Sequence, residues 1–156
     1  RVRESVFGIL TAVISKARVL DLYAGSGALG IEALSRGGAS CTFVEQNRGA
    51  CRIIAENLEK TGCDDGRVIQ REVGAFLRSE STSYDLIFAD PPYADGLSDP
   101  ARDLIAIEGW KQWLSEDGFL ILEREAAGEL PDPKELALVQ SRDYGRSRIT
   151  IYQLKS

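Results

Sequence analysis

The four residues Asp90-Pro91-Pro92-Tyr93 directly follow an apolar segment that is typical of a buried strand. Two successive prolines fix the backbone and lack N–H groups, so the arm that they form has carbonyl oxygens free to accept hydrogen bonds. Asp90 and the Pro91 carbonyl could each accept one N–H of an exocyclic base amine, while Tyr93 stacks on the extruded base. The pattern predicts that residues 90–93 form a catalytic group that orients a nucleobase amine.

A glycine-rich run, Gly25-Ser26-Gly27-Ala28-Leu29-Gly30, matches G-x-G-x-x-G between a predicted strand and a predicted helix. Glycine allows the tight turn and lets a ligand approach the backbone without meeting a Cβ atom. Glu45 ends the next predicted strand, where a doubly wound sheet offers a carboxylate to a ribose diol. Together these features predict an adenosine-type ligand, which is either a dinucleotide or S-adenosylmethionine.

Asp21 lies four residues before Gly25, at the carboxyl end of the first predicted strand. A carboxylate there repels the pyrophosphate of a dinucleotide and attracts the ammonium group of an amino acid. This position favours S-adenosylmethionine, although Asp21 would serve equally well as a cap for the glycine turn.

The chain contains no histidine, which excludes imidazole bases and histidine metal ligands from any mechanism. Methyl transfer from a sulfonium needs no strong base, because alignment and electrostatic stabilisation supply most of the rate. We therefore expect S-adenosylmethionine as the methyl donor and no metal.

Short apolar segments alternate with amphipathic ones, which predicts a Rossmann-like α/β fold: a mostly parallel seven-stranded sheet with helices on both faces. The last two strands are expected to form an antiparallel hairpin around residues 143–145. The predicted strands are residues 18–22, 41–45, 67–71, 84–89, 119–123, 135–141 and 148–154. The predicted helices are residues 2–14, 31–36, one from the N-cap Asn47 to about 60, a short one through 75–77, and one from 98 or 99 to about 114.

The length of 156 residues suits a single domain covering the whole chain, and 44% hydrophobic with 28% charged residues is ordinary for a soluble one. Cys41, Cys51 and Cys63 fit neither a CxxC pair nor a disulfide framework, so we expect free thiols in a cytoplasmic protein. Because residue 1 is not methionine, we expect a further N-terminal stretch before it.

In order along nearly the whole chain, several segments resemble the bacterial 16S rRNA guanine-N2 methyltransferases, a class I family. The matching segments are RVRESVF at 1–7, VLDLYAGSGALG at 19–30, FVE at 43–45, DPPY at 90–93 and the strand pair around Tyr144-Gly145. DPPY also occurs in DNA adenine-N6 methyltransferases. The resemblance implies methylation of guanine N2 in the RNA of the small ribosomal subunit.

The resemblance also implies roles for individual residues. Gly25, Ser26 and Gly27 would line the methionine part of the cofactor, Glu45 would hold the ribose, and Glu72 stands where the family usually offers an aspartate to the adenine amine. The full set of expected cofactor contacts is Asp21, Tyr23, Ala24, Gly25, Ser26, Gly27, Glu45, Gln46, Glu72 and Val73. The family normally begins with a basic β-hairpin before the segment that matches residues 1–7, so we expect part of the RNA-binding surface outside this chain.

The charge is unevenly distributed: the net charge is −5, yet residues 1–20 and 141–156 each carry four basic side chains and one acidic one. Basic ends around an acidic middle are consistent with an acidic cofactor site beside an RNA surface. The RNA-facing residues predicted at these ends are Arg1, Arg3, Arg142, Arg146 and Arg148, with Lys16, Arg18 and Lys155 as further basic groups. We expect a monomer that binds rRNA or the small subunit.

Three alternatives remain open at the level of sequence. A DNA adenine-N6 methyltransferase would share the chemistry, but 156 residues leave no room for a target-recognition insertion. An NAD-dependent oxidoreductase would share the glycine run but would lack a histidine to polarise a carbonyl. A non-catalytic RNA-binding protein could retain the same fold.

Overall fold

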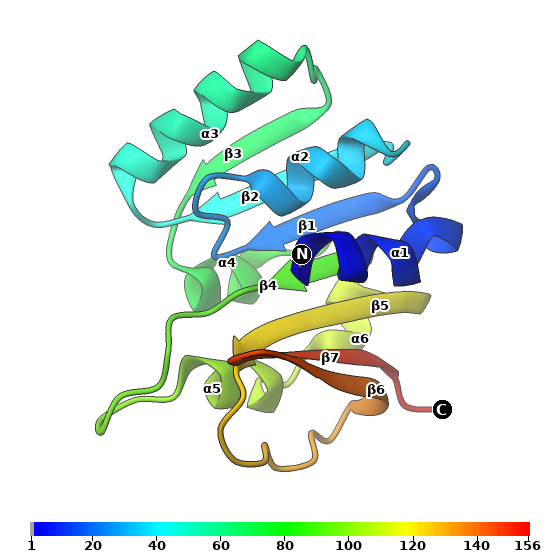
Figure 1. The fold of residues 1–156 in the computed structure, drawn as a ribbon, viewed down its shortest axis with the longest axis vertical. Coiled ribbons are helices and arrows are strands. Elements are labelled where there is room, and N and C mark those ends of the chain that lie inside the picture. The colour runs from blue at the N-terminus through cyan, green and yellow to red at the C-terminus, as the bar shows by residue number, and fades with distance from the viewer. Residues whose placement is uncertain (1) are drawn as a thin grey trace.

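The computed structural model describes residues 2–156, with side chains from Glu4 onwards. A seven-stranded sheet in the order β3-β2-β1-β4-β5-β7-β6 runs through the molecule (Figure 1). Neighbouring strands from β3 to β5 are parallel, whereas β7 is antiparallel to both β5 and β6. The strands are β1 Arg18–Leu22, β2 Ser40–Glu45, β3 Gly66–Gln70, β4 Tyr84–Ala89, β5 Leu114–Glu125, β6 Leu136–Tyr144 and β7 Ser147–Leu154. The predicted fold class is confirmed.

Six helices among the described residues cover the two faces of the sheet. They are α1 Val2–Ile14, α2 Ala28–Ser35, α3 Arg48–Thr61, α4 Val73–Ser79, α5 Pro100–Ala106 and α6 Trp110–Trp113. One buried cluster joins α1, α2 and α3 to one face, with Phe7, Phe43 and Phe88 at its centre. The other joins α4, α5 and α6 to the opposite face around Trp110. Because both faces are covered, the central strands β1 and β4 are almost wholly buried.

The parallel register brings the loops of the site to one edge of the sheet. Leu22 of β1 pairs with Val44 of β2 on one side and with Ala89 of β4 on the other, so these three strands end side by side. From β1 the chain continues to β2 and β3 on one side of β1, and it then crosses to β4 on the other side of β1. Ligands of such sheets bind at this topological switch point, beyond the carboxyl ends of the strands.

Three predicted elements differ from those observed. The helix expected over residues 31–36 begins already at Ala28, because the αL residue Gly27 ends the turn after β1 and needs no polar cap. The helix expected from 98 or 99 to about 114 is broken into α5 and α6. Gly109 lies between them with φ 137°, and the Glu135 carboxylate accepts the backbone N–H groups of Gly109 and Lys111, both at 3.0 Å.

Strand β5 is the third difference, because it extends over Leu114–Glu125 instead of residues 119–123. The segment Ser115–Gly118 reads as a loop in sequence, but the register between β4 and β5 shifts there and the strand continues through it. The other strand and helix boundaries agree with the prediction to within a few residues. The extended end of β5 pairs Glu125 with Ser147 at the start of β7.

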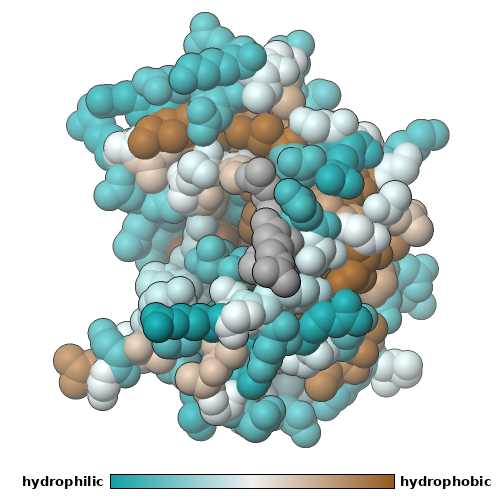
Figure 2. Space-filling model, in the orientation of Figure 1, coloured by the Kyte–Doolittle hydropathy of each residue, from teal (hydrophilic) through white to brown (hydrophobic). Residues whose placement is uncertain are grey.

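The segment between β4 and α5 projects from the body of the molecule (Figure 1). Figure 2 shows a hydrophobic group at the end of this projection, where Leu97 is 98% exposed. The Asp95 carboxylate accepts the backbone N–H groups of Leu97 and Ser98 at 2.7 and 2.8 Å, which fixes the turn at the tip. The loop therefore carries Tyr93 at its base and an apolar side chain at its end.

The three cysteines are free thiols, as expected: Cys41 and Cys51 are buried and Cys63 is half-buried. None of the helices within residues 2–156 has the length and apolar character needed to cross a membrane.

Candidate active site

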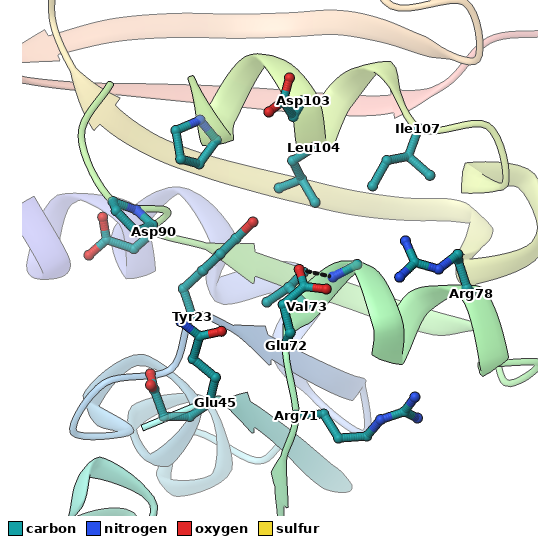
Figure 3. Close-up of a pocket in the computed structure, with 14 residues that line it drawn as sticks. Tyr23, Glu45, Arg71, Glu72, Val73, Arg78, Asp90, Asp103, Leu104 and Ile107 are labelled. Atoms are coloured by element: carbon teal, nitrogen blue, oxygen red, sulfur yellow. Dashed lines mark hydrogen bonds between the residues drawn. The ribbon is translucent and has the colours of Figure 1, made fainter. Parts of the chain in front are cut away.

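A cavity of about 680 Å³ opens at the carboxyl edge of the parallel strands (Figure 3). Seven of the predicted site residues line it: Tyr23, Glu45, Gln46, Glu72, Val73, Asp90 and Pro92. They come from the ends of β1, β2, β3 and β4, which are far apart in the sequence. The strand order therefore brings together half of the predicted site residues, whereas the expected cofactor contacts Asp21, Ala24, Gly25, Ser26 and Gly27 do not line this cavity.

The glycine run does not line this cavity but shapes its rim. Gly25 and Gly27 have φ angles of 59° and 81°, a region that residues with a Cβ atom rarely adopt. The Glu45 carboxylate accepts the backbone N–H of Gly25 through one oxygen and that of Asn47 through the other, both at 2.9 Å. The Asn57 amide, on α3, donates to the Ser26 carbonyl at 3.0 Å. Glu45 thus holds the glycine turn in place while it faces the cavity.

Asp21 is not accessible to a ligand in the cavity, although the sequence predicted a contact with the cofactor at this residue. It is 2% exposed, it does not line the cavity, and its carboxylate accepts the backbone N–H of Gly30 at 3.1 Å. Burial, together with the nearby charges of Asp90 and Glu45, raises the pKa of Asp21 to about 8 against the opposing effect of that hydrogen bond. The geometry observed is that of the alternative, a carboxyl that holds the start of α2 against β1.

Glu72 is the N-cap residue of α4. Its two carboxylate oxygens accept the backbone N–H groups of Gly74 at 2.8 Å (Figure 3) and of Ala75 at 3.0 Å. Such a cap satisfies N–H groups that have no partner within the helix. Each oxygen retains a second lone pair, so Glu72 could still accept a ligand N–H at the cavity wall.

Helix α5 forms a wall of the cavity that the sequence reasoning missed. Pro100, Asp103, Leu104 and Ile107 all line the cavity. They are spaced i, i+3, i+4 and i+7, which is one face of a helix that begins after the N-cap Asp99. This spacing is the signal that could have identified them. Leu104 and Ile107 supply an apolar surface and Asp103 supplies a carboxylate.

Tyr23 lines the cavity and lies beside Glu72 and below Leu104 in Figure 3. It adopts φ 55°, a left-handed conformation that is uncommon for a residue other than glycine. Burial raises the pKa of Tyr23 to about 12, helped by the charges of Glu72 and Asp103. Its hydroxyl therefore stays protonated at neutral pH.

A second cavity of about 300 Å³ adjoins the first at the DPPY segment. It is lined by Asp90, Pro91, Pro92, Tyr93, Glu123, Arg124 and Ser147. Asp90 and Pro92 line both cavities, so this arm is the wall that the two share. Tyr93 is 68% exposed at the open side of the second cavity. All four residues of the predicted catalytic group thus line the second cavity, and two of them also line the first.

Asp90 is exposed as a residue, but the surrounding protein withdraws its carboxyl group from water. This burial, together with the charge of Glu123, raises the pKa of Asp90 to about 6. Asp90 is therefore mostly ionised at neutral pH, and it holds a proton more readily than an ordinary aspartate.

The charges of the main cavity suit a cationic or hydroxyl-bearing ligand better than a pyrophosphate. Four carboxyl groups line it, from Glu45, Glu72, Asp90 and Asp103, against the guanidinium groups of Arg71 and Arg78. Of these two, Arg71 is held by the Ser79 hydroxyl at 2.8 Å and the Ala75 carbonyl at 3.2 Å. Carboxylates accept hydrogen bonds from a ribose diol and attract a sulfonium, so the residues present fit S-adenosylmethionine.

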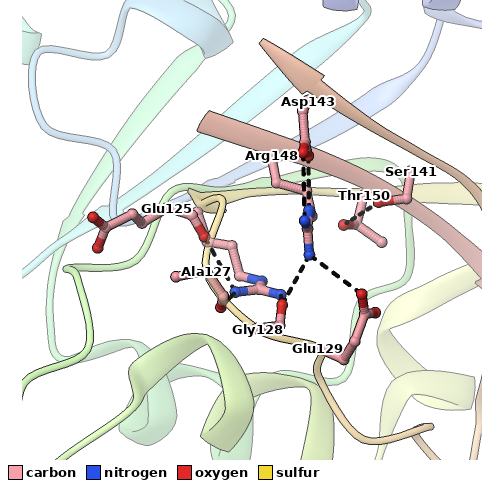
Figure 4. A network of polar contacts seen from close by, with 9 residues as sticks. Glu125, Ala127, Gly128, Glu129, Ser141, Asp143, Arg148 and Thr150 are labelled. Carbon is pink, nitrogen blue, oxygen red and sulfur yellow. Dashed lines mark hydrogen bonds and ion pairs between the residues drawn. The ribbon is translucent and has the colours of Figure 1, made fainter. Parts of the chain in front are cut away.

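The basic C-terminal segment is divided between surface and interior contacts. Arg142 and Arg146 are exposed. Arg148 is not free as expected: its side chain is only 19% exposed and donates to Asp143 at 2.8 Å and to the Gly128 carbonyl at 2.8 Å (Figure 4). Arg148 holds the loop after β5 against the hairpin, so the predicted RNA contact at this residue is replaced by an internal one.

The other predicted basic groups fall into two sets. Arg1 and the side chain of Arg3 lie outside the described part of the structure. Lys16 and Arg18 precede or begin β1, and Lys155 follows β7, which runs in the opposite direction. These last three residues therefore lie at the edge of the sheet away from the two cavities.

Comparison with known proteins identifies relatives over nearly the whole chain. The family described as Conserved hypothetical protein 95 matches residues 1–153. The Ribosomal RNA small subunit methyltransferase D of Escherichia coli is 34% identical over 154 residues, which cover 98% of this chain and 76% of that protein. YlbH of Bacillus subtilis is 33% identical and covers 98% of this chain and 84% of its own length. The solved structure of yhhF from Escherichia coli has a TM-score of 0.87 at 33% identity, covering 99% of this chain and 84% of that one.

Proposed function

The chain belongs to the Conserved hypothetical protein 95 family, and on that premise we propose that it methylates the N2 amine of a guanine in small-subunit rRNA. It acts as an S-adenosylmethionine-dependent rRNA methyltransferase. The observation that carries the proposal is the shared wall of the two cavities, where Asp90 and Pro92 face both. A donor in the larger space and a base in the smaller one would meet at the DPPY arm.

The larger cavity holds the cofactor in this proposal. Glu45 would accept hydrogen bonds from the ribose hydroxyls, and Glu72 and Val73, which line the same cavity, would hold the adenine. Leu104 of α5 and Ile107 directly after it would supply an apolar surface for the ring. The glycine turn of Gly25 and Gly27 lets the methionine part approach the backbone.

The DPPY arm orients the acceptor. When bound, S-adenosylmethionine would supply a methyl carbon activated by its sulfonium. The N2 lone pair forms the new nitrogen–carbon bond, and the electron pair of the broken carbon–sulfur bond stays on sulfur. Asp90 and the Pro91 carbonyl each accept one N2 hydrogen, which aligns the lone pair. Tyr93 stacks on the base at the open side of its cavity. Asp90 then receives the proton that N2 loses, for which its raised pKa suits it.

The same residues disfavour the other functions considered. The carboxylates of the larger cavity suit NAD poorly, because they repel its pyrophosphate. A DNA adenine-N6 methyltransferase would need a segment that reads duplex sequence, and the loop from Ala94 to Asp99 is short. We expect residues 1–156 to act as one catalytic domain in the cytoplasm, where the small subunit is assembled.

A tritium-methyl transfer assay tests the proposal. Purified protein is given labelled S-adenosylmethionine with either small-subunit particles, naked small-subunit rRNA or duplex DNA. We expect label in the particles or the rRNA and none in DNA. Label that appears only in DNA would contradict the proposal, and tight NAD binding with no response to S-adenosylhomocysteine in calorimetry would replace it with the oxidoreductase.

A further inference from the structure

The smaller cavity contains a second carboxylate, Glu123, that the proposed mechanism does not use. Glu123 lies near the end of β5, one residue beyond the pair formed by Leu122 and Ala89. Asp90 is likewise one residue beyond Ala89, so the parallel register places Glu123 and Asp90 next to each other on the same face of the sheet. The two carboxylates therefore stand side by side in the wall of one cavity.

The immediate surroundings leave Glu123 available to a ligand. Arg124 also lines the cavity, but its guanidinium donates to the carbonyls of Ala127 at 2.9 Å and Gly128 at 2.7 Å. Among the side chains from Glu4 onwards, the Glu123 carboxylate has no hydrogen bond or ion pair. The cavity thus presents two neighbouring acceptors without a fixed cation between them.

Guanine is the base whose edge matches two neighbouring acceptors. Its N1–H and its N2 amine are adjacent donors, whereas adenine presents an unprotonated N1 acceptor beside its N6 amine. A carboxylate next to the amine-binding group attracts the N1–H of guanine and repels the N1 lone pair of adenine. Cytosine likewise offers an acceptor beside its amine.

We propose that the Glu123 carboxylate accepts the N1–H of the target base while Asp90 and the Pro91 carbonyl hold its N2 hydrogens. Glu123 is then the residue that restricts the enzyme to guanine. This inference rests on the proposed function, because it names the base that the same site accepts.

The variant Glu123→Gln tests the inference because a glutamine can also donate to an unprotonated N1. The substrates are small-subunit RNAs that carry either guanine or 2-aminopurine at the methylated position, since 2-aminopurine keeps the 2-amine but lacks the N1 hydrogen. Assays at pH 8 keep Asp90 ionised, because its pKa of about 6 lies well below the pH of the assay. We expect the unmodified enzyme to prefer guanine, and Glu123→Gln to reduce the guanine/2-aminopurine ratio of kcat/KM by about 10- to 100-fold, the size typical of a hydrogen bond to a charged group.

The exposed Glu125 provides the matched control, since Glu125→Gln removes the same charge two residues along β5 and outside the cavity. We expect this variant to keep the guanine/2-aminopurine ratio of the unmodified enzyme. Both variants should keep the affinity of the unmodified enzyme for S-adenosylhomocysteine. An unchanged ratio in Glu123→Gln would overturn the inference, as would an equal change in Glu125→Gln. If the unmodified enzyme transfers no methyl group to either RNA, the proposed function itself fails.

Discussion

Asp90 lines both cavities, and it is the ionisable one of the two residues that do so, which links its protonation state to the rate of methyl transfer. In the proposed mechanism an ionised Asp90 accepts an N2 hydrogen, whereas a protonated one cannot do so through the same oxygen. Because its pKa is raised to about 6, the single-turnover rate should fall as the pH decreases through about 6. A pH profile from 5 to 8 measures this, and a rate that stays constant down to pH 5 would contradict the role.

Replacing Asp90 with alanine separates the two cavities' functions. We expect Asp90→Ala to lower kcat by about 100-fold or more, because it removes the acceptor that aligns the amine. The affinity for S-adenosylhomocysteine should remain largely unchanged, as measured by calorimetry, because the proposed cofactor contacts of Glu45, Glu72 and α5 remain. A parallel loss of cofactor affinity would instead assign Asp90 to the cofactor cavity.

Asp21 should couple stability to pH. Its folded pKa is raised from 3.8 to about 8 by burial, so the folded state keeps a proton that the unfolded chain loses above pH 4. The stabilisation is complete below about pH 4 and is lost as the pH rises towards and through about 8. Asp21→Asn can still accept from Gly30 and carries no charge, so its free energy of unfolding should exceed that of the unmodified protein by a few kcal/mol at pH 9 and match it at pH 4.

Chemical denaturation at the two pH values measures this difference, and an equal difference at both would contradict the assignment. The same variant tests the predicted contact with the cofactor ammonium group. Weaker binding of S-adenosylhomocysteine by Asp21→Asn would support that contact, whereas unchanged affinity would leave Asp21 with its role at Gly30 alone.

Among the elements, α2 depends on a glycine for its close approach to the sheet. A Cβ atom on Gly30 would lie 2.6 Å from the Cys41 sulfur and would also collide with the Phe43 ring. Gly30→Ala should therefore destabilise the fold by about 1–3 kcal/mol, the usual cost of overpacking a core. Gly8→Ala is the control, because a Cβ atom there meets nothing within 4 Å and alanine favours α1 by about 0.5–1 kcal/mol. Urea denaturation compares them, and equal stabilities would contradict the packing role.

Element types and their order could be predicted from the sequence because hydrophobic periodicity and glycine positions mark them locally. The break between α5 and α6 could not, because it depends on Glu135, which reaches Gly109 from 26 residues away. The DPPY arm and Glu45 could be predicted because local motifs mark them. The hydrogen bond from Arg148 to the Gly128 carbonyl could not, because the two residues are distant in the sequence. Contacts between segments distant in the sequence decide these positions.

At the scale of the whole molecule, the exposed basic residues near the cavities should govern RNA binding. Arg142 and Arg146 lie at the end of β6 and in the turn after it, on the same edge as the DPPY arm. Replacing both with glutamate should weaken RNA binding about tenfold or more and reduce its salt dependence, because phosphate contacts are lost. The control pair Lys16→Glu and Lys155→Glu, at the opposite edge, should bind RNA normally.

Filter binding at several salt concentrations measures these affinities. Equal losses in the two pairs would indicate a general effect of net charge and would contradict a surface restricted to the active-site edge. Cofactor affinity should be unchanged in all four substitutions, since none of these residues lines the larger cavity.

The proposed reaction is tested most directly by nucleoside mass spectrometry of small-subunit rRNA after incubation of unmethylated particles with the protein and S-adenosylmethionine. The proposed function predicts one new N2-methylguanosine, absent when Asp90→Ala replaces the unmodified protein. Methyl groups found only on adenine N6, or no methylated nucleoside at all, would contradict the claim that the DPPY arm presents guanine N2 to the methyl donor.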